Sequence, residues 1–168
     1  MAEVRRQFVR QMSKKVLRDS RITNPPVDLE VILHAHGIKY SEVEDFPDTV
    51  DALIVEDGTQ IHAAVNARQH LHRRRFSLAH ELGHFFLHRG LSEDTAVSID
   101  NPPDENEETW SKSPQEIEAD LFAGELLVPL EMLKPRRSLQ IPDLAKVFLV
   151  SEQVVSVAIS RHYAALFK

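Results

Sequence analysis

The stretch LAHELGHFF (residues 78–86) decides how the chain is interpreted, because it sets a His-Glu-x-x-His motif inside an apolar segment. Residues four apart lie one turn apart on the same face of a helix, so the imidazoles of His80 and His84 can converge on one cation. Glu81 lies about 100° further round, where its carboxylate can accept a proton from water that the cation activates. The motif predicts a metal site with Glu81 as general base. The alternative is a pair of structural helix histidines.

The third ligand must come from another part of the chain. His88 lies two turns beyond His80, about 12 Å along the axis, which is too far to share the cation. Downstream, Glu116 and Asp120 are four apart on a predicted helix and project from one face. This spacing offers Glu116 as a ligand and Asp120 as the acceptor for the other ring N–H of a ligand histidine. Glu118 is the competing ligand, and it would require the helix to be rotated.

Composition limits the possible function classes. The chain has 168 residues, of which 42% are apolar and 27% charged, and these values are typical of one soluble globular domain. No apolar run is long enough for a membrane span, and the first twenty residues are charged throughout, so we expect a cytoplasmic protein. The absence of cysteine restricts metal ligands to His, Asp and Glu. A net charge of −6 argues against a surface built to bind phosphate backbones.

The chain is expected to form an α+β fold in three parts. Residues 1–24 form a basic amphipathic helix, on which Val4, Phe8, Met12 and Val16 make an apolar stripe. Residues 25–135 form the metal-site domain, with an acidic loop insert at 91–115. Residues 136–168 form a helical hairpin.

Turn and capping residues divide the metal-site domain into strands and helices. Asp57-Gly58 between two apolar runs predicts a β-hairpin of residues 52–55 and 61–65, and residues 38–43 add a strand to a small antiparallel or mixed sheet. Five stretches, two of them in the C-terminal part, show helical patterns. These are residues 28–36, 75–89 (capped by Ser77 and stopped by Gly90), 115–128 and, in the C-terminal part, 143–148 with 152–166.

Two blocks of sequence together resemble the ImmA/IrrE family of metallo-endopeptidases, namely RFSLAHELGH (residues 75–84) and EIEADLFAGELLVP (residues 116–129). The resemblance spans about residues 27–130. It implies a zincin-like fold and a Zn²⁺ cofactor held by His80, His84 and Glu116, with Glu81 as general base. It also implies a protein substrate, a helix-turn-helix transcriptional repressor of mobile-element or stress genes. The insert at 91–115 departs from the usual family pattern.

Zincin architecture gives a role to the second strand of the hairpin. If residues 61–65 form the edge strand above the cleft, their free backbone N–H and C=O groups can pair with an extended substrate. The residues that would bind substrate in this way are Ile61, His62, Ala63, Ala64 and Val65. The alternative is an edge covered by the acidic loop.

The C-terminal segment resembles a helix-turn-helix, with Ser151 capping its second helix. Its charge does not favour direct DNA binding, because the second helix begins with Glu152-Gln153 and few side chains could reach phosphates. We therefore expect a helical hairpin packed on the domain. The leading hypothesis is a zinc-dependent endopeptidase, although His₂-carboxylate sites also accept other divalent cations. The alternative is a non-proteolytic metal-containing regulator that binds DNA or a repressor.

Overall fold

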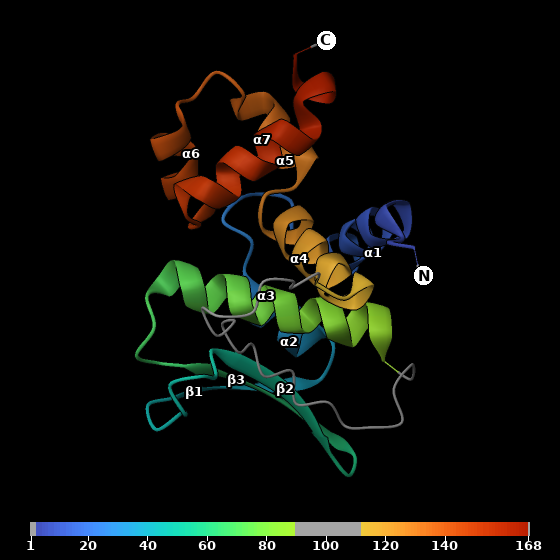
Figure 1. Cartoon of the computed structure of the whole chain (residues 1–168), viewed down its shortest axis with the longest axis vertical. Coiled ribbons are helices and arrows are strands. Elements are labelled where there is room, and N and C mark those ends of the chain that lie inside the picture. Colours follow the sequence, from blue (N-terminus) through green and yellow to red (C-terminus); the bar gives the residue numbers. More distant parts are fainter. Residues whose placement is uncertain (1–2, 90–111, 168) are drawn as a thin grey trace.

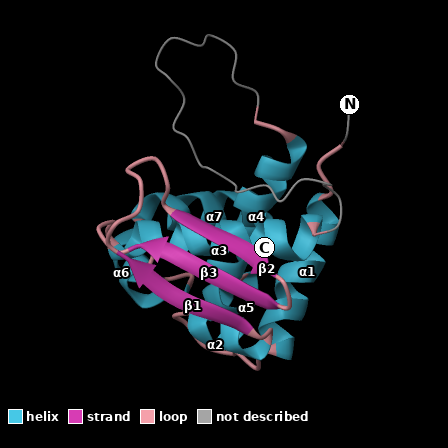
Figure 2. Cartoon of the chain, turned by 90° about the horizontal axis from the view of Figure 1, so that it is seen from below, coloured by secondary structure: helices cyan, strands magenta, loops and turns pink. Residues whose placement is uncertain are grey.

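Helices cover one face of a small sheet in the computed structural model, which describes residues 3–89 and 112–167 (Figures 1 and 2). Helix α3 (Leu71–His88) crosses that face, and α4 (Pro114–Leu127) packs on α3. Helix α1 (Arg6–Asp19) lies beside α4, and the short α2 (Leu29–Ala35) lies next to the sheet. The predicted fold class, α+β with a small mixed sheet, is confirmed.

The sheet has the strand order β1-β3-β2. Strand β1 (Ile38–Val43) runs parallel to β3 (Gln60–Asn66), and β2 (Ala52–Asp57) pairs with β3 in antiparallel fashion. The β2–β3 hairpin turns at Asp57-Gly58, where Gly58 has φ +61°, a conformation that glycine adopts without strain. The strands and the hairpin predicted from the sequence are present.

The prediction that residues 61–65 form an edge strand is wrong. β3 is the central strand, with β1 on one side and β2 on the other. The backbone groups of Ile61, His62, Ala63, Ala64 and Val65 therefore lie in the ladders of the protein's own sheet. The charges give the physical reason. Charged side chains are typical of edge strands: β1 carries Lys39 and Glu42 and β2 carries Glu56 and Asp57, whereas β3 carries no Asp, Glu, Lys or Arg.

Helix α3 begins at Leu71, four residues before the predicted start. His70 caps it, because its Nδ1 accepts a hydrogen bond from the backbone N–H of His72 at 3.2 Å. Ser77, the predicted cap, is buried within the helix. Ionic contacts to the sheet and its loop support the added first turn, since Arg73 pairs with Asp51 at 2.7 Å and Arg74 with Glu42 at 2.6 Å. The predicted stop at Gly90 lies outside the described residues, as does most of the 91–115 insert.

Gly83 allows α3 and α4 to lie very close together. A Cβ atom at this position would stand 2.9 Å from Ala119 Cα and 3.1 Å from its carbonyl oxygen. Ala119 is fully buried, and so are Leu82 and Phe122 on the two helices. The backbones of the helices that carry the candidate ligands are therefore held directly against each other at this crossing.

The buried face of α1 differs from the predicted stripe. Val9, Ser13, Val16 and Leu17 are buried, whereas Phe8 is 38% exposed and Arg5 lies over its ring. Ser13 can be buried because its hydroxyl donates to the carbonyl of Arg10 at 3.1 Å.

The C-terminal residues form a separate group of helices at one end of the molecule (Figure 1). They are α5 (Leu130–Leu133), the 3₁₀ turn η1 (Lys134–Arg136), α6 (Ile141–Phe148) and α7 (Glu152–Leu166). Ser151 caps α7 as predicted, accepting from Val154 N at 3.3 Å, and α7 also contacts α4. Within the described residues, no helix combines the length and apolar character needed to cross a membrane.

Candidate metal centre

His80 and His84 occupy successive turns of α3 on the side that faces α4. Their Nε2 atoms are 3.0 Å apart. The His80 side chain is 3% exposed and that of His84 20%, so His80 is buried and His84 is the more accessible of the two rings. The helical spacing therefore brings the two imidazoles together, as the motif predicts.

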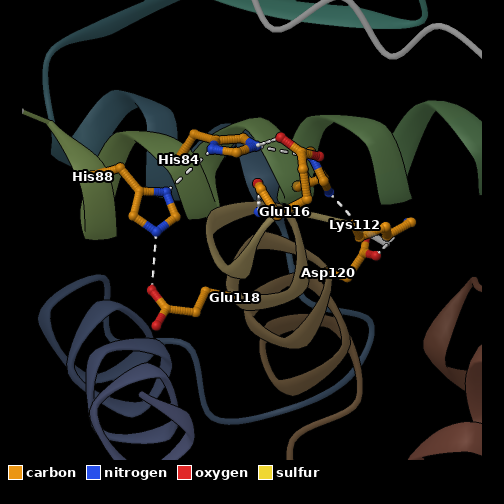
Figure 3. Close-up of polar contacts among 8 residues, drawn as sticks. His84, His88, Lys112, Glu116, Glu118 and Asp120 are labelled. Carbon is orange, nitrogen blue, oxygen red and sulfur yellow. Dashed lines mark hydrogen bonds and ion pairs between the residues drawn. The ribbon is translucent and has the colours of Figure 1, made fainter. Parts of the chain in front are cut away.

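Glu116 completes the cluster from the first turn of α4. Ser113 starts that helix, with its hydroxyl oxygen accepting from Glu116 N at 3.2 Å. The Glu116 carboxylate lies across both rings. Its Oε2 is 3.2 Å from His80 Nε2. Its Oε1 is 3.1 Å from His84 Nε2, a contact that can be followed in Figure 3. Ligand atoms of the three residues all lie within 4.8 Å of one another.

The three residues fit a divalent cation. Donor atoms that stand 2.0–2.1 Å from a tetrahedral zinc ion are separated by about 3.3 Å. The two Nε2 atoms are 3.0 Å apart, and one Glu116 oxygen lies 3.2 Å from His80 Nε2 while the other lies 3.1 Å from His84 Nε2, so the donors are spaced nearly as such a tetrahedron requires. Two imidazoles and a carboxylate are a known zinc ligand set, and they leave the fourth corner to water or substrate.

Glu81 is buried beside this cluster. It follows His80 in α3 and is 5% exposed. Its charge acts on the neighbouring ring, where it favours the protonated form of His80. A carboxylate in this position is suited to exchange protons with groups that reach the cluster.

Asp120 holds the outer nitrogen of His80. Its Oδ1 lies 2.9 Å from His80 Nδ1. Its Oδ2 accepts a hydrogen bond from Lys112 Nζ at 2.6 Å (Figure 3). Because a carboxylate can only accept, Nδ1 carries a proton in either charge state of the ring, and the neutral ring directs the lone pair of Nε2 at the cluster.

The protonation equilibria of the cluster are strongly shifted in the absence of a cation. Burial opposes the charged ring of His80, but hydrogen bonds to Asp120 and Glu116 outweigh it and raise the pKa to about 10. Hydrogen bonds to His80 and His84 hold the pKa of Glu116 well below its usual range. The negative carboxylate of Glu116 is therefore balanced by a second proton on the His80 ring, and a divalent cation would take the place of that proton.

Glu118, the competing ligand, faces away from the two rings. It is 1% exposed and binds Arg5, the residue before α1, through Nη2 at 2.6 Å and through the backbone N–H at 2.7 Å. Its Oε2 also lies 3.0 Å from Nε2 of His88. The side-chain hydrogen bond from Arg5 lowers the pKa of Glu118 to about 2.

His88 lies between this buried carboxylate and the cluster. Its Nδ1 is 3.1 Å from Nδ1 of His84. Sequence reasoning set His88 aside as a ligand but did not find its contacts, nor the role of Arg5 and Lys112. The available signals were a third histidine four residues after His84, and carboxylates at alternate positions of the next helix, Glu116, Glu118 and Asp120.

The fold and the cluster define an α+β domain in which two helices hold a His-His-Glu set able to bind a divalent cation. A family model confirms and refines this class. The chain belongs to the Peptidase_M78 family, described as the IrrE N-terminal-like domain, whose model matches residues 62–160. That match includes all three candidate ligands and Glu81.

Comparison with solved structures finds a similar fold. A structure described as a Mycobacterium tuberculosis transcriptional regulator matches with a TM-score of 0.61 and 17% sequence identity, over 89% of this chain. The match covers 45% of the regulator, so this chain corresponds to less than half of that protein's length. No curated protein matches the sequence.

Proposed function

We propose that this protein is a zinc-dependent endopeptidase of zincin-like fold, with a helix-turn-helix transcriptional repressor as its cytoplasmic substrate. The observation that carries the proposal is the convergence of His80, His84 and Glu116, with Glu81 buried beside them in the same motif. Membership of a peptidase family supports the reaction type. The likeness to a transcriptional regulator supports a role in the control of gene expression.

The roles of the residues follow from their positions. His80, His84 and Glu116 would hold the cation, and Asp120 would keep the His80 ring oriented. A bound zinc ion supplies Lewis acidity, which polarises the scissile carbonyl and makes water more acidic. Glu81 accepts the proton of the attacking water and returns it to the leaving amine. The same donor set would also accept other divalent cations.

The substrate strand must be reassigned within this proposal. Because β3 is central, its backbone is not available to an extended peptide. In the described part of the sheet, β1 and β2 are the outer strands, and β2 is the one that α3 packs against more extensively. We therefore assign substrate pairing to β2, residues 52–57, in place of residues 61–65.

The test is cleavage by matched variants. Zinc-loaded wild type, Glu81→Gln and the surface control Glu131→Gln are each mixed with purified candidate repressors, with and without chelator, and the products are identified by mass spectrometry. Wild type and Glu131→Gln should give the same chelator-sensitive fragments. Glu81→Gln should keep its zinc but cleave roughly 10²–10⁴-fold more slowly. Undiminished cleavage by the zinc-loaded Glu81→Gln protein would refute the proposal. An intact repressor held in a stable complex would instead favour the non-proteolytic regulator.

A further inference from the structure

The two candidate histidine ligands are held in different ways. His80 Nδ1 meets a carboxylate directly, that of Asp120, at 2.9 Å. His84 Nδ1 meets a second imidazole, that of His88, at 3.1 Å, and His88 in turn meets Glu118 at 3.0 Å (Figure 3). Three carboxylates at alternate positions of α4 thus make different contacts with the two rings. Glu116 contacts Nε2 of both, and Asp120 contacts Nδ1 of His80. Glu118 reaches Nδ1 of His84 only through His88.

The hydrogen-bond donors and acceptors in this series can be assigned from its far end. Glu118 accepts from Arg5 through Nη2 at 2.6 Å, Nε at 3.0 Å and the backbone N–H at 2.7 Å. A carboxylate so paired acts only as an acceptor, so His88 Nε2 must donate to it. A neutral ring protonated at Nε2 carries its lone pair at Nδ1. His88 Nδ1 therefore accepts, and His84 Nδ1 must donate.

This assignment fixes the nitrogen of His84 that faces the cluster. With its proton on Nδ1, His84 presents the lone pair of Nε2, the atom that lies 3.1 Å from Glu116 and 3.0 Å from His80 Nε2. The opposite assignment would direct an N–H at the cation position and prevent binding. A metal-ligating histidine commonly has its other nitrogen fixed by such an outer partner.

We propose that Arg5, Glu118 and His88 form a positioning chain that holds His84 in its metal-binding orientation and tautomer. The proposal rests on the metal site of the proposed function and extends it to the N-terminal segment. Glu118 is 1% exposed and His88 8%, so the two members of the chain nearest the cluster are shielded from water, whereas the Arg5 side chain is 43% exposed. Arg5 lies 113 positions before Glu118 in the sequence, and through this chain it contributes to metal affinity.

The molecule contains a matched control for Arg5. Arg10, on α1, binds Glu125, a second buried carboxylate of α4, through Nε at 3.2 Å. The two arginine side chains are equally exposed, 43% for Arg5 and 42% for Arg10, and their carboxylate partners are 2% and 4% exposed. Within the described residues, Glu125 binds His162 of α7 and makes no hydrogen bond or ion pair with the His-His-Glu cluster. Removal of either arginine loosens α1 from α4, but only Arg5 belongs to the positioning chain.

The test measures zinc affinity by competition with a chromophoric chelator, with Zn²⁺ as the only added metal. Arg5→Ala should weaken binding severalfold, and His88→Phe by the roughly 10–100-fold typical of outer-shell changes. Arg10→Ala should stay within about twofold of wild type. An equal affinity in Arg5→Ala and Arg10→Ala would overturn the proposal, whether or not His88→Phe folds.

A spectroscopic measurement tests the tautomer directly. In the zinc-loaded protein, long-range ¹H–¹⁵N correlation of the histidine rings should show His88 protonated at Nε2 and unprotonated at Nδ1. A His88 ring protonated at Nδ1 would overturn the assignment. The outcomes also separate this proposal from the metal site itself: a wild type that binds no zinc refutes both, whereas tight binding that Arg5→Ala leaves unchanged refutes only the positioning chain.

Discussion

Replacement of Gly83 by alanine should separate the two helices that carry the ligands. The added Cβ would stand 2.9 Å from Ala119 Cα and 3.1 Å from its carbonyl oxygen, whereas carbon atoms normally pack 3.5–4.0 Å apart. The obstacle is backbone, so α4 must move away from α3 by roughly 0.5 Å or more. Such overpacking costs about 1–3 kcal/mol, against about 1 kcal/mol gained because alanine favours a helix. We expect a net loss of roughly 0–2 kcal/mol of stability.

Gly124→Ala is the matched control, because it makes the same chemical change in the partner helix. Its Cβ would meet Arg161 Nη1 at 2.8 Å, which is the far end of a flexible side chain that can turn aside. This variant should therefore keep most of the helix-propensity gain of about 1 kcal/mol. The difference between the two variants isolates the backbone contact between α3 and α4.

The assay has two parts, and the reasoning requires both. Urea unfolding in the presence of chelator gives the stability of each variant, and chelator competition gives its zinc affinity. Ala119 lies one turn after Glu116, so the displacement of α4 should also weaken zinc binding, by roughly tenfold or more, in Gly83→Ala and not in Gly124→Ala. A Gly83→Ala protein as stable as Gly124→Ala and with wild-type zinc affinity would refute the reasoning.

Three further changes give separate expectations. Asp120→Ala should weaken zinc binding roughly 10–100-fold in chelator competition, and unchanged affinity would exclude its orienting role. Burial raises the pKa of Glu125, but its partners, His162 first, lower it below the ordinary value. The ionised Glu125 therefore stabilises the fold at any pH above the ordinary pKa of a glutamate, and this stabilisation is lost as the pH falls through the lowered pKa. Glu125→Gln should make the free energy of unfolding, measured by urea titration, decrease less steeply at acid pH. Arg75→Ala removes hydrogen bonds to Leu149 O at 3.0 Å and Val27 O at 2.8 Å and should cost about 1–3 kcal/mol, with an unchanged unfolding midpoint as the contrary result.

Local patterns in the sequence predicted the elements that depend on local interactions. The Asp57-Gly58 turn follows from backbone conformation, and the Ser151 cap follows from a hydrogen bond made within the next three residues. The convergence of His80 and His84 follows from helical periodicity. Each of these features is fixed by residues close together in the chain, and for that reason each was visible before the fold was known.

Features that depend on packing between distant segments were not decided by the sequence. The choice between Glu116 and Glu118 depends on the rotation of α4 about its axis, which the contact of Gly83 with Ala119 fixes. The position of β3 at the centre of the sheet depends on the side to which β1 adds. The contact of Arg5 with Glu118 joins residues 113 positions apart, and no local pattern in the sequence predicts it.

The most direct measurement is a zinc-edge anomalous difference map from crystals of the zinc-loaded protein. We expect a single strong peak at the cluster, bonded to Nε2 of His80, Nε2 of His84 and the carboxylate of Glu116, with its remaining position open to solvent. A peak ligated by Glu118, a fourth protein ligand that closes the site, or no peak between the two imidazoles would contradict the proposed metal centre.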